Sequence, residues 1–198
     1  MTKHKSQDER RAQILDAARA CFIRNGYGHT RVDDIAKEAG LSKGGVYFHF
    51  HSKREIFDAL LERQQGRTAS IVAEVQGMTG SIVEKLTLLG GALTRAFADG
   101  GDHGKFLVVL AEMGIREDDV FKRVADAHAL YVELIASFIQ QGIDAGELRE
   151  IDPKMAALYI KLITDGIEQG LALGYEFDTE RFLASALDIL FNGLRPRD

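Results

Sequence analysis

Apolar residues recur at spacings of three and four along nearly the whole chain, and this period most constrains what the chain can fold into. The chain has only two prolines, Pro153 and Pro196, which lack the backbone N–H that a helix interior needs. No stretch shows the apolar–polar alternation of a half-buried strand. Amphipathic helices must bury their apolar faces against one another. The sequence therefore predicts an all-α fold, with a small three-helix head and a larger helical body.

Glycine and capping residues predict where the helices begin and end. We expect Thr30 to cap the second helix in a T-x-x-D box with Asp33, Ser52 to cap the fourth in a box with Glu55, and Asp152 to cap the helix that starts at Pro153. The expected helices span residues 8–25, 31–39, 43–50, 53–75, 81–99, 104–116, 118–141, 153–174 and 179–194.

Length and composition narrow the class of protein. The chain has 198 residues, room for one domain or for a small domain fused to a medium one, and we expect a division into residues 1–63 and 64–198. No apolar run approaches the ~18 residues of a membrane span, and the charged N-terminus lacks a signal-peptide stretch. A single cysteine, Cys21, agrees with a reducing compartment. We expect a cytoplasmic protein with no membrane partner.

Charge is distributed unevenly along the chain. Residues 1–54 hold 11 Lys and Arg against 6 Asp and Glu, a net charge of +5, whereas the rest of the chain carries −10. A basic N-terminal segment on an acidic body suggests that one end meets a polyanion, although chance surface charge gives the same count.

Residues 31–50 have the order short helix, glycine-containing turn, short helix that is typical of a helix-turn-helix. In that motif the second helix lies in the major groove of DNA with its N-terminal residues near the base edges. This second helix, K-G-G-V-Y-F-H-F from Lys43, has two glycines that each cost ~1 kcal/mol of helix propensity. Close approach of the backbone to DNA would explain them; the alternative is an ordinary tight helical corner.

The first third of the chain resembles the DNA-binding domain of the tetracycline-repressor (TetR) family of bacterial regulators. The resemblance rests on R-x-x-I-L-D-A-A at 11–18, F-x-x-x-G-Y at 22–27, T-R-V-D-D-I-A-K-E-A-G-L-S-K-G-G-V-Y-F-H-F at 30–50 and H-S-K-R-E-I-F at 51–57. The remainder resembles the family in size and helical character.

The resemblance implies roles for single residues at a DNA interface. Lys43 would contact a base edge, most simply guanine O6 and N7, and Tyr47 a phosphate or a thymine methyl. Thr30 and Lys53 would bind phosphates, whereas Gly45 departs from the commoner Thr or Ala. The basic tail Lys3–Lys5 could reach the DNA or be disordered. The residues implied in DNA binding are Thr30, Arg31, Ser42, Lys43, Gly44, Tyr47, Phe48, His49 and Lys53.

The last two helices predict a homodimer interface, because small and apolar residues there recur at spacing four. Intrachain packing is the alternative, and the resemblance favours a four-helix bundle with a second copy. The expected interface residues are Leu158, Leu162, Gly166, Gly170, Phe182, Ala186 and Leu190.

The helices between residues 81 and 141 would enclose a pocket for an unidentified small-molecule effector. Aromatic residues and methionines at helical spacing are also typical of plain core. The candidate lining residues are Phe97, Phe106, Leu110, Met113, Phe121, Tyr131 and Phe138.

No catalytic, phosphate-loop or dinucleotide motif occurs, and His49 and His51 lack a partner at metal-site spacing, so we expect no enzyme, cofactor or metal. The resemblance implies a sequence-specific DNA-binding regulator, most simply a dimeric repressor that a small molecule releases from an inverted-repeat operator in double-stranded DNA. The alternatives are an activator, a regulator controlled by a protein partner, and a helical enzyme or adaptor with a helix-turn-helix-like head.

Overall fold

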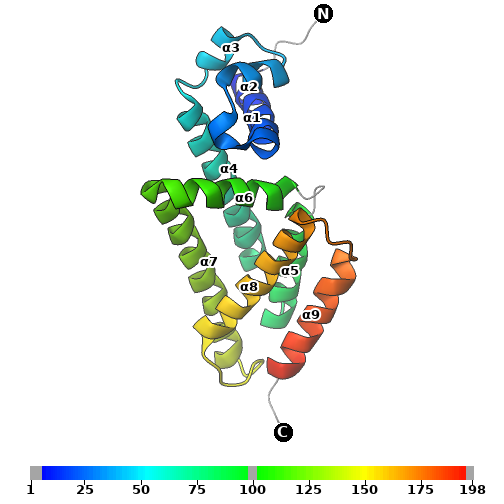
Figure 1. Ribbon diagram of the computed structural model, residues 1–198. Coiled ribbons are helices and arrows are strands. Elements are labelled where there is room, and N and C mark those ends of the chain that lie inside the picture. Colours follow the sequence, from blue (N-terminus) through cyan, green and yellow to red (C-terminus); the bar gives the residue numbers. More distant parts are fainter. Residues whose placement is uncertain (1–5, 98–101, 195–198) are drawn as a thin grey trace, which may run out of the picture.

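The computed structural model describes residues 6–97 and 102–194 of the chain, so the basic tail Lys3–Lys5 lies outside the described residues. Those residues form nine α-helices and no strand, which confirms the all-α prediction. A small head stands at one end of an elongated molecule, and a larger bundle of helices forms the body (Figure 1).

Three helices and the start of a fourth make the head. They are α1 (Gln7–His29), α2 (Val32–Glu38), α3 (Lys43–Tyr47) and α4 (Lys53–Gly77). Ile14, Phe22, Val46, Phe50 and Phe57 lie fully buried between them. Burial of these large side chains, each contributing about 1.5–3 kcal/mol relative to exposure, holds the short α3 in place.

Two glycines shape the head, because glycine adopts left-handed backbone angles without the strain that other residues would incur. Gly26 has φ of +76° and kinks α1, so the chain continues as a helical turn to His29 instead of stopping at residue 25 as expected. Gly40 has φ of +64° and makes the turn between α2 and α3. This turn sets the angle at which α3 projects from the head.

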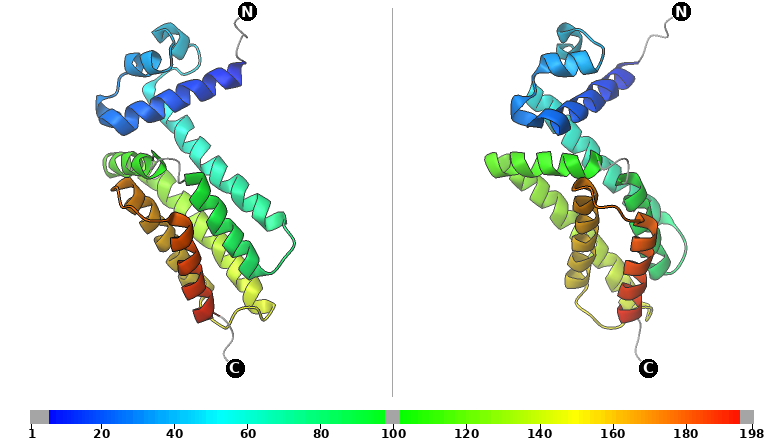
Figure 2. Two further views of the ribbon diagram at one scale, coloured as in Figure 1. Left: turned by 90° about the vertical axis from the view of Figure 1, so that its right-hand side faces the viewer. Right: turned by 45° about the vertical axis from the view of Figure 1, so that its right-hand side comes forward.

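Five further helices complete the body, and their observed bounds lie close to the predicted ones. They are α5 (Ile82–Phe97), α6 (Asp102–Arg116), α7 (Asp118–Asp144), α8 (Pro153–Ala172) and α9 (Thr179–Leu194). Asp152 caps α8 as predicted, since its Oδ1 accepts hydrogen bonds from the N–H groups of Lys154 and Met155 at 2.9 and 3.1 Å. α6 crosses the body beneath the head, while α5, α7, α8 and α9 run roughly along the long axis (Figures 1 and 2).

The expected boundary at residues 63 and 64 falls inside α4, which runs from the head into the body without a break. α6 also joins the two parts. Phe106, Leu110 and Met113 of α6 belong to the same apolar core as α1 and the start of α4, and the rings of Phe57 and Phe106 lie 6.5 Å apart. The head therefore rests on the body through a shared core.

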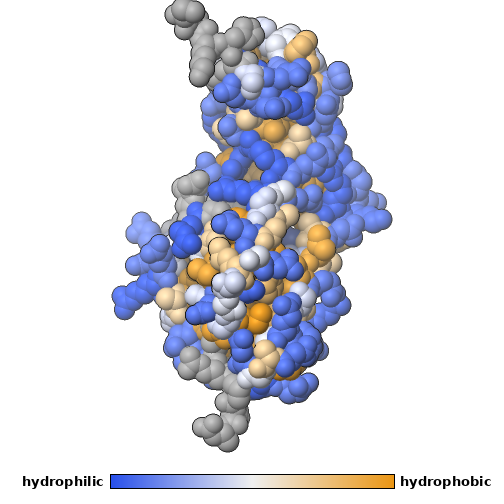
Figure 3. Space-filling model, turned by 180° about the vertical axis from the view of Figure 1, so that it is seen from behind, coloured by the Kyte–Doolittle hydropathy of each residue, from blue (hydrophilic) through white to orange (hydrophobic). Residues whose placement is uncertain are grey.

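A second core fills the lower body between α4, α5, α7 and α8, with Leu89, Ile135, Phe138 and Ile139 at its centre. Seen from behind, polar side chains cover most of the head, and apolar side chains gather on the body (Figure 3). Among the described residues no helix combines the length and the apolar character needed to cross a lipid bilayer.

Candidate nucleic-acid interface

The N-terminus of α3 is exposed to solvent. Ser42 caps the helix, with its Oγ accepting a hydrogen bond from the Gly45 N–H at 3.0 Å. Ser42, Lys43 and Gly44 are all exposed, and α3 lies at the end of the molecule away from the body (Figure 1). An exposed first turn with free N–H groups is suited to approach a DNA backbone or groove.

Packing within the chain does not require glycine at residue 44. A Cβ built on Gly44 would meet only Ser42 Oγ, at 3.9 Å, which is ordinary van der Waals contact, and the φ of Gly44 is not positive. Alanine would raise helix propensity here by up to ~1 kcal/mol. Packing within the chain therefore does not account for this glycine, whereas close approach of a DNA backbone, as predicted from the sequence, would.

Lys43 forms an ion pair with Asp33, a residue ten positions earlier on α2. Its Nζ lies 2.9 Å from Asp33 Oδ2 on α2, with both side chains more than half exposed. The hydrogen bond to Asp33 raises the pKa of Lys43, so the ammonium stays charged. An exposed pair of this kind contributes only ~0–1 kcal/mol, so Lys43 can leave Asp33 for a base or a phosphate.

An aromatic edge follows α3. Tyr47 is 41% and Phe48 is 73% exposed, and the rings of Phe48 and His49 meet edge-on at 5.1 Å. Arg11 of α1 donates a hydrogen bond to the His49 carbonyl at 2.8 Å and fixes this segment to α1. The regular helix ends at Tyr47, earlier than the expected residue 50, so Phe48 and His49 lie in the turn that follows it.

Thr30 has a different role from the predicted one. Its side chain is 1% exposed, and its Oγ1 donates to the carbonyls of Gly26 at 2.8 Å and Cys21 at 3.2 Å. These carbonyls lie at the kinked end of α1 and attract the hydroxyl inward, so the predicted T-x-x-D cap is wrong. Asp34, not Asp33, accepts the hydrogen bond from the Arg31 N–H, and the buried Thr30 hydroxyl is at odds with a phosphate contact.

Lys53 also points inward. Its Nζ donates to the carbonyls of Tyr27 at 2.7 Å and Thr30 at 2.8 Å, and lies 4.3 Å from the centre of the Tyr27 ring. Burial lowers the pKa of Lys53. This geometry makes Lys53 a brace between α4 and the α1–α2 connection and does not support its predicted phosphate contact. Arg31, in contrast, is exposed at the start of α2.

Ser52 caps α4 as predicted, but its capping box is incomplete. Ser52 Oγ accepts from the Glu55 N–H at 3.0 Å, whereas the Glu55 carboxylate accepts from the N–H of His51, one residue before the expected partner.

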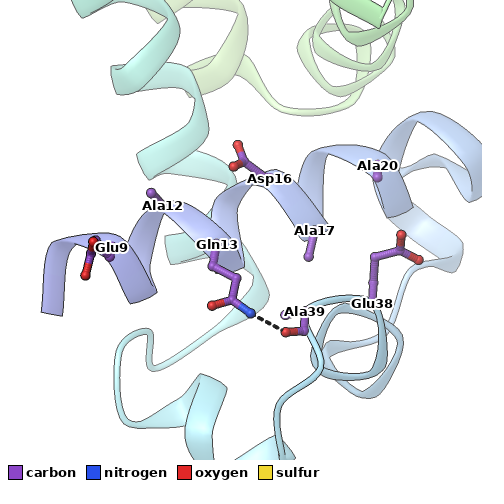
Figure 4. A pocket seen from close by; sticks show the side chains of 8 residues that line it. All are labelled: Glu9, Ala12, Gln13, Asp16, Ala17, Ala20, Glu38 and Ala39. Atoms are coloured by element: carbon purple, nitrogen blue, oxygen red, sulfur yellow. Dashed lines mark hydrogen bonds between the residues drawn. The ribbon is translucent and has the colours of Figure 1, made fainter. Parts of the chain in front are cut away.

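A shallow groove between α1 and α2 shows which side of the head does not suit DNA. Ala12, Ala17, Ala20 and Ala39 line it together with Gln13, whose side-chain amide donates a hydrogen bond to the Ala39 carbonyl at 2.6 Å (Figure 4). Its charged lining residues are the acids Glu9, Asp16 and Glu38. Asp16 and Glu38 pair with Arg63 and Arg24, no basic residue lines the groove to hold a phosphate, and no residue of α3 lines it.

The expected dimer residues divide into exposed and buried sets. Leu158, Leu162 and Phe182 are 39%, 61% and 47% exposed, and nothing lies within 4 Å of a Cβ placed on Gly166. Gly170, however, packs against Tyr175 and Phe177 of its own chain. Ile189, on the same predicted stripe of α9 as Phe182, is also exposed, and α8 exposes two further apolar side chains outside the predicted set, Met155 and Tyr159. α8 and α9 form one side of the body (Figures 1 and 2).

Most of the predicted pocket residues are core or surface. Phe106, Leu110 and Met113 are buried in the core shared with the head, Phe138 is buried in the body core, and Phe121 is 64% exposed. The side chain of Phe97 lies outside the described residues.

A cavity does lie in the body, between α5, α7, α8 and α9. Tyr131 is the predicted pocket residue that lines it, together with Ala186 and Leu190 of the predicted dimer interface. The periodicity could not separate these uses, because a helix buried on two sides shows apolar residues on both.

Comparison with known proteins agrees with this geometry. Residues 14–60 match the family model of the bacterial regulatory proteins of the tetR family, and residues 79–169 match a C-terminal domain described as tetracyclin repressor-like. These matches lie on either side of the expected domain boundary.

Three similar proteins extend the comparison. The "Uncharacterized HTH-type transcriptional regulator YfiR" of Bacillus subtilis is 33% identical over 155 residues, covering 74% of this chain and 72% of that protein. The "Fatty acid metabolism regulator protein" of the same organism is 28% identical over 145 residues, covering 73% and 74%. The crystal structure of FadR from Bacillus subtilis in complex with stearoyl-CoA shares the fold, with a TM-score of 0.75, 23% identity and coverage of 93% and 99%. The chain belongs to the TetR family of bacterial regulatory proteins and is a DNA-binding transcriptional regulator.

Proposed function

We propose that the chain is a homodimeric repressor that binds an inverted-repeat operator through α3 and leaves it when a small molecule binds the body. The exposed N-terminus of α3, with a glycine at residue 44 that intrachain packing does not need, is the observation that carries this proposal. Arg31, Ser42, Lys43, Tyr47, Phe48 and His49 are the further residues that we assign to the DNA interface.

Dimerisation is supported by the apolar side chains that α8 and α9 expose on one side of the body, Leu158, Leu162 and Phe182 among them. A single short recognition helix makes few contacts, so a second copy is needed for tight binding. Two heads of a dimer read half-sites separated by about one helical turn, roughly 34–36 Å, or a multiple of it. The two-fold symmetry of the dimer then requires an inverted repeat.

Release by an effector is supported by the shared core between α6 and the head. Phe106 and Met113 pack among head residues, and Arg54 of α4 forms ion pairs with Glu117 and Asp119 at the α6–α7 junction. A shift of α6 would therefore move the head and change the distance between the two α3 helices. The ligand releases DNA only to the extent that it binds the shifted state more tightly.

Repression needs no contact beyond DNA, because a dimer on a promoter blocks polymerase by occupying it. Activation would need an additional surface for polymerase, and control by a protein partner would need one for that partner. Transcription from a promoter carrying the operator, measured with and without the protein, separates these signs of regulation.

Selection of bound duplexes from a random DNA library, at near-physiological salt, tests the proposal. We expect an enriched inverted repeat and an affinity that falls steeply with salt concentration, because each neutralised phosphate releases counterions. A preparation that was unfolded and refolded without ligand serves as the control for co-purified effector. If neither preparation enriches a sequence, the proposed operator binding is wrong.

A further inference from the structure

The cavity between α5, α7, α8 and α9 is aliphatic and free of charge on its walls. Nine of its twelve lining residues are Leu, Ile or Ala, and the others are Gly90, Tyr131 and Thr164. Side chains of four helices line it, and it is partly open to solvent. A cavity with these walls excludes sugars, nucleotides and ions as occupants, because their polar groups would lose water without finding partners.

Polar groups lie at only one side of the cavity, toward α6. Tyr131 and Thr164 line it there, and Lys161 Nζ lies 5.6 Å from the centre of the Tyr131 ring. About one turn closer to α6 along α8 is Glu168, whose carboxylate lies 3.5 Å from Nε2 of the buried His103. The cavity is thus amphipathic, with an aliphatic body and one polar end.

The charges near this polar end are already paired within the chain. Lys161 forms an ion pair with Asp165, and Glu168 faces His103. Burial raises the pKa of Tyr131, with the nearby Glu168 and Asp165 acting in the same direction, so its phenol remains a neutral hydrogen-bonding group. An anionic ligand end would meet the carboxylates of Asp165 and Glu168, and the one nearby lysine, Lys161, is already paired with Asp165. An uncharged donor or acceptor would instead find the Tyr131 phenol.

The cavity must widen to hold a ligand, because its volume is about 30 Å³, whereas small-molecule sites in proteins measure about 300–1,000 Å³. We expect α9 to be the wall that moves when a ligand enters. It supplies Leu183, Ala186, Leu187 and Leu190, and its main packing partner is α5 alone. Gly90 of α5 faces these residues, and a Cβ built on it would meet Leu183 at 3.6 Å and Leu187 at 3.9 Å, in ordinary van der Waals contact.

We propose that this cavity is the effector site and takes an uncharged amphiphile, an aliphatic chain that ends in a hydroxyl, ester or amide group. The chain lies between Gly90 and α9, and the polar end reaches Tyr131 and Thr164. The inference rests on the proposed function for the consequence of binding. Movement of α9, whose Phe182 and Ile189 are exposed for a second copy, would change the dimer and with it the spacing of the heads.

Two glycines that follow each other on α5 supply a matched test. A side chain at Gly90 would enter the cavity, whereas one at Gly91 would meet only the flexible end of Arg95, at 3.2 Å. Gly90→Leu and Gly91→Leu change helix propensity equally, and they differ in the direction in which the new side chain points. Decan-1-ol is the probe, decanoate is its charged counterpart, and binding is measured by calorimetry on protein whose folding is checked by circular dichroism.

We expect wild type and Gly91→Leu to bind decan-1-ol alike, and Gly90→Leu to bind it about tenfold more weakly or worse, since added side-chain volume displaces ligand methylenes. Decanoate should bind wild type more weakly than the alcohol. If Gly90→Leu does not fold, Gly90→Ala and Gly91→Ala give the same comparison with a smaller difference.

Equal binding by the folded Gly90 and Gly91 variants would overturn the site, as would no binding to wild type. Tighter binding of decanoate would overturn the uncharged end. Operator selection without any alcohol reports separately on the proposed function, so a failure of one is distinguishable from a failure of the other.

Discussion

The head and the body are both helical, but they assemble their candidate binding sites in different ways. In the head, most of the residues that we assign to the DNA interface lie in α3 or directly beside it, and Ser42, Lys43 and Gly44 are consecutive in sequence. In the body, the cavity takes residues from four helices that span more than half of the chain, from Leu86 to Leu190. A contact surface for DNA can be local because one helix fits into the major groove. A small-molecule site, in contrast, needs walls from several helices. The head is thus recognisable from a short motif, and the body is not.

The largest predicted effect concerns the core that joins the two regions. Phe106→Ala should lower the free energy of unfolding by about 3–5 kcal/mol, because the buried ring packs in the core that α6 shares with the head. Thermal and urea unfolding measure this loss. Phe121→Ala, which truncates an exposed ring on α7, is the control and should change stability by about 0.5 kcal/mol or less. Similar losses for both variants would mean that α6 does not join head and body in this way.

A second variant distinguishes support within the head from contact with DNA. Lys53→Met should lower stability by about 1.5–3 kcal/mol, because the carbonyls of Tyr27 and Thr30 lose charged hydrogen bonds. Its affinity for DNA should keep the same dependence on salt. A salt slope that falls by about 1, with stability unchanged, would show instead that Lys53 neutralises a phosphate.

The smallest effect concerns the choice of bases. Lys43→Ala should leave stability within about 0.5 kcal/mol of wild type, because only the exposed pair with Asp33 is lost. It should relax the preference at one base pair of the operator by about 1–3 kcal/mol. Binding to a panel of singly substituted operators measures this. An equal loss of affinity for all of these operators would show that Lys43 contacts a phosphate and not a base.

The helices, the glycine-containing turn between α2 and α3 and the caps Ser52 and Asp152 could be predicted from the sequence, because these depend on residues close in the chain. Prediction failed where a partner comes from afar. The inward bonds of Thr30 and Lys53 depend on carbonyls that the kink at Gly26 leaves free.

The body shows the same limit more strongly. Phe106 and Phe138 are apolar at helical spacing like Tyr131, yet the first two fill cores and the third lines a cavity. Only the packing of whole helices decides between these uses. The exposed half of the α8 stripe, Leu158 to Gly166, could be found from spacing, but not that Gly170 turns toward its own chain.

One paired measurement tests most directly the claim that α3 is built for DNA and not for its own stability. Gly44→Ala places a methyl group where the chain leaves room, 3.9 Å from the nearest atom. We predict that the variant is as stable as wild type or up to ~1 kcal/mol more stable, because alanine favours a helix. We also predict that it binds the selected operator about tenfold or more weakly, because the methyl group separates the α3 backbone from the groove. Unchanged operator affinity, or a fall in affinity that follows a loss of stability, would contradict the account.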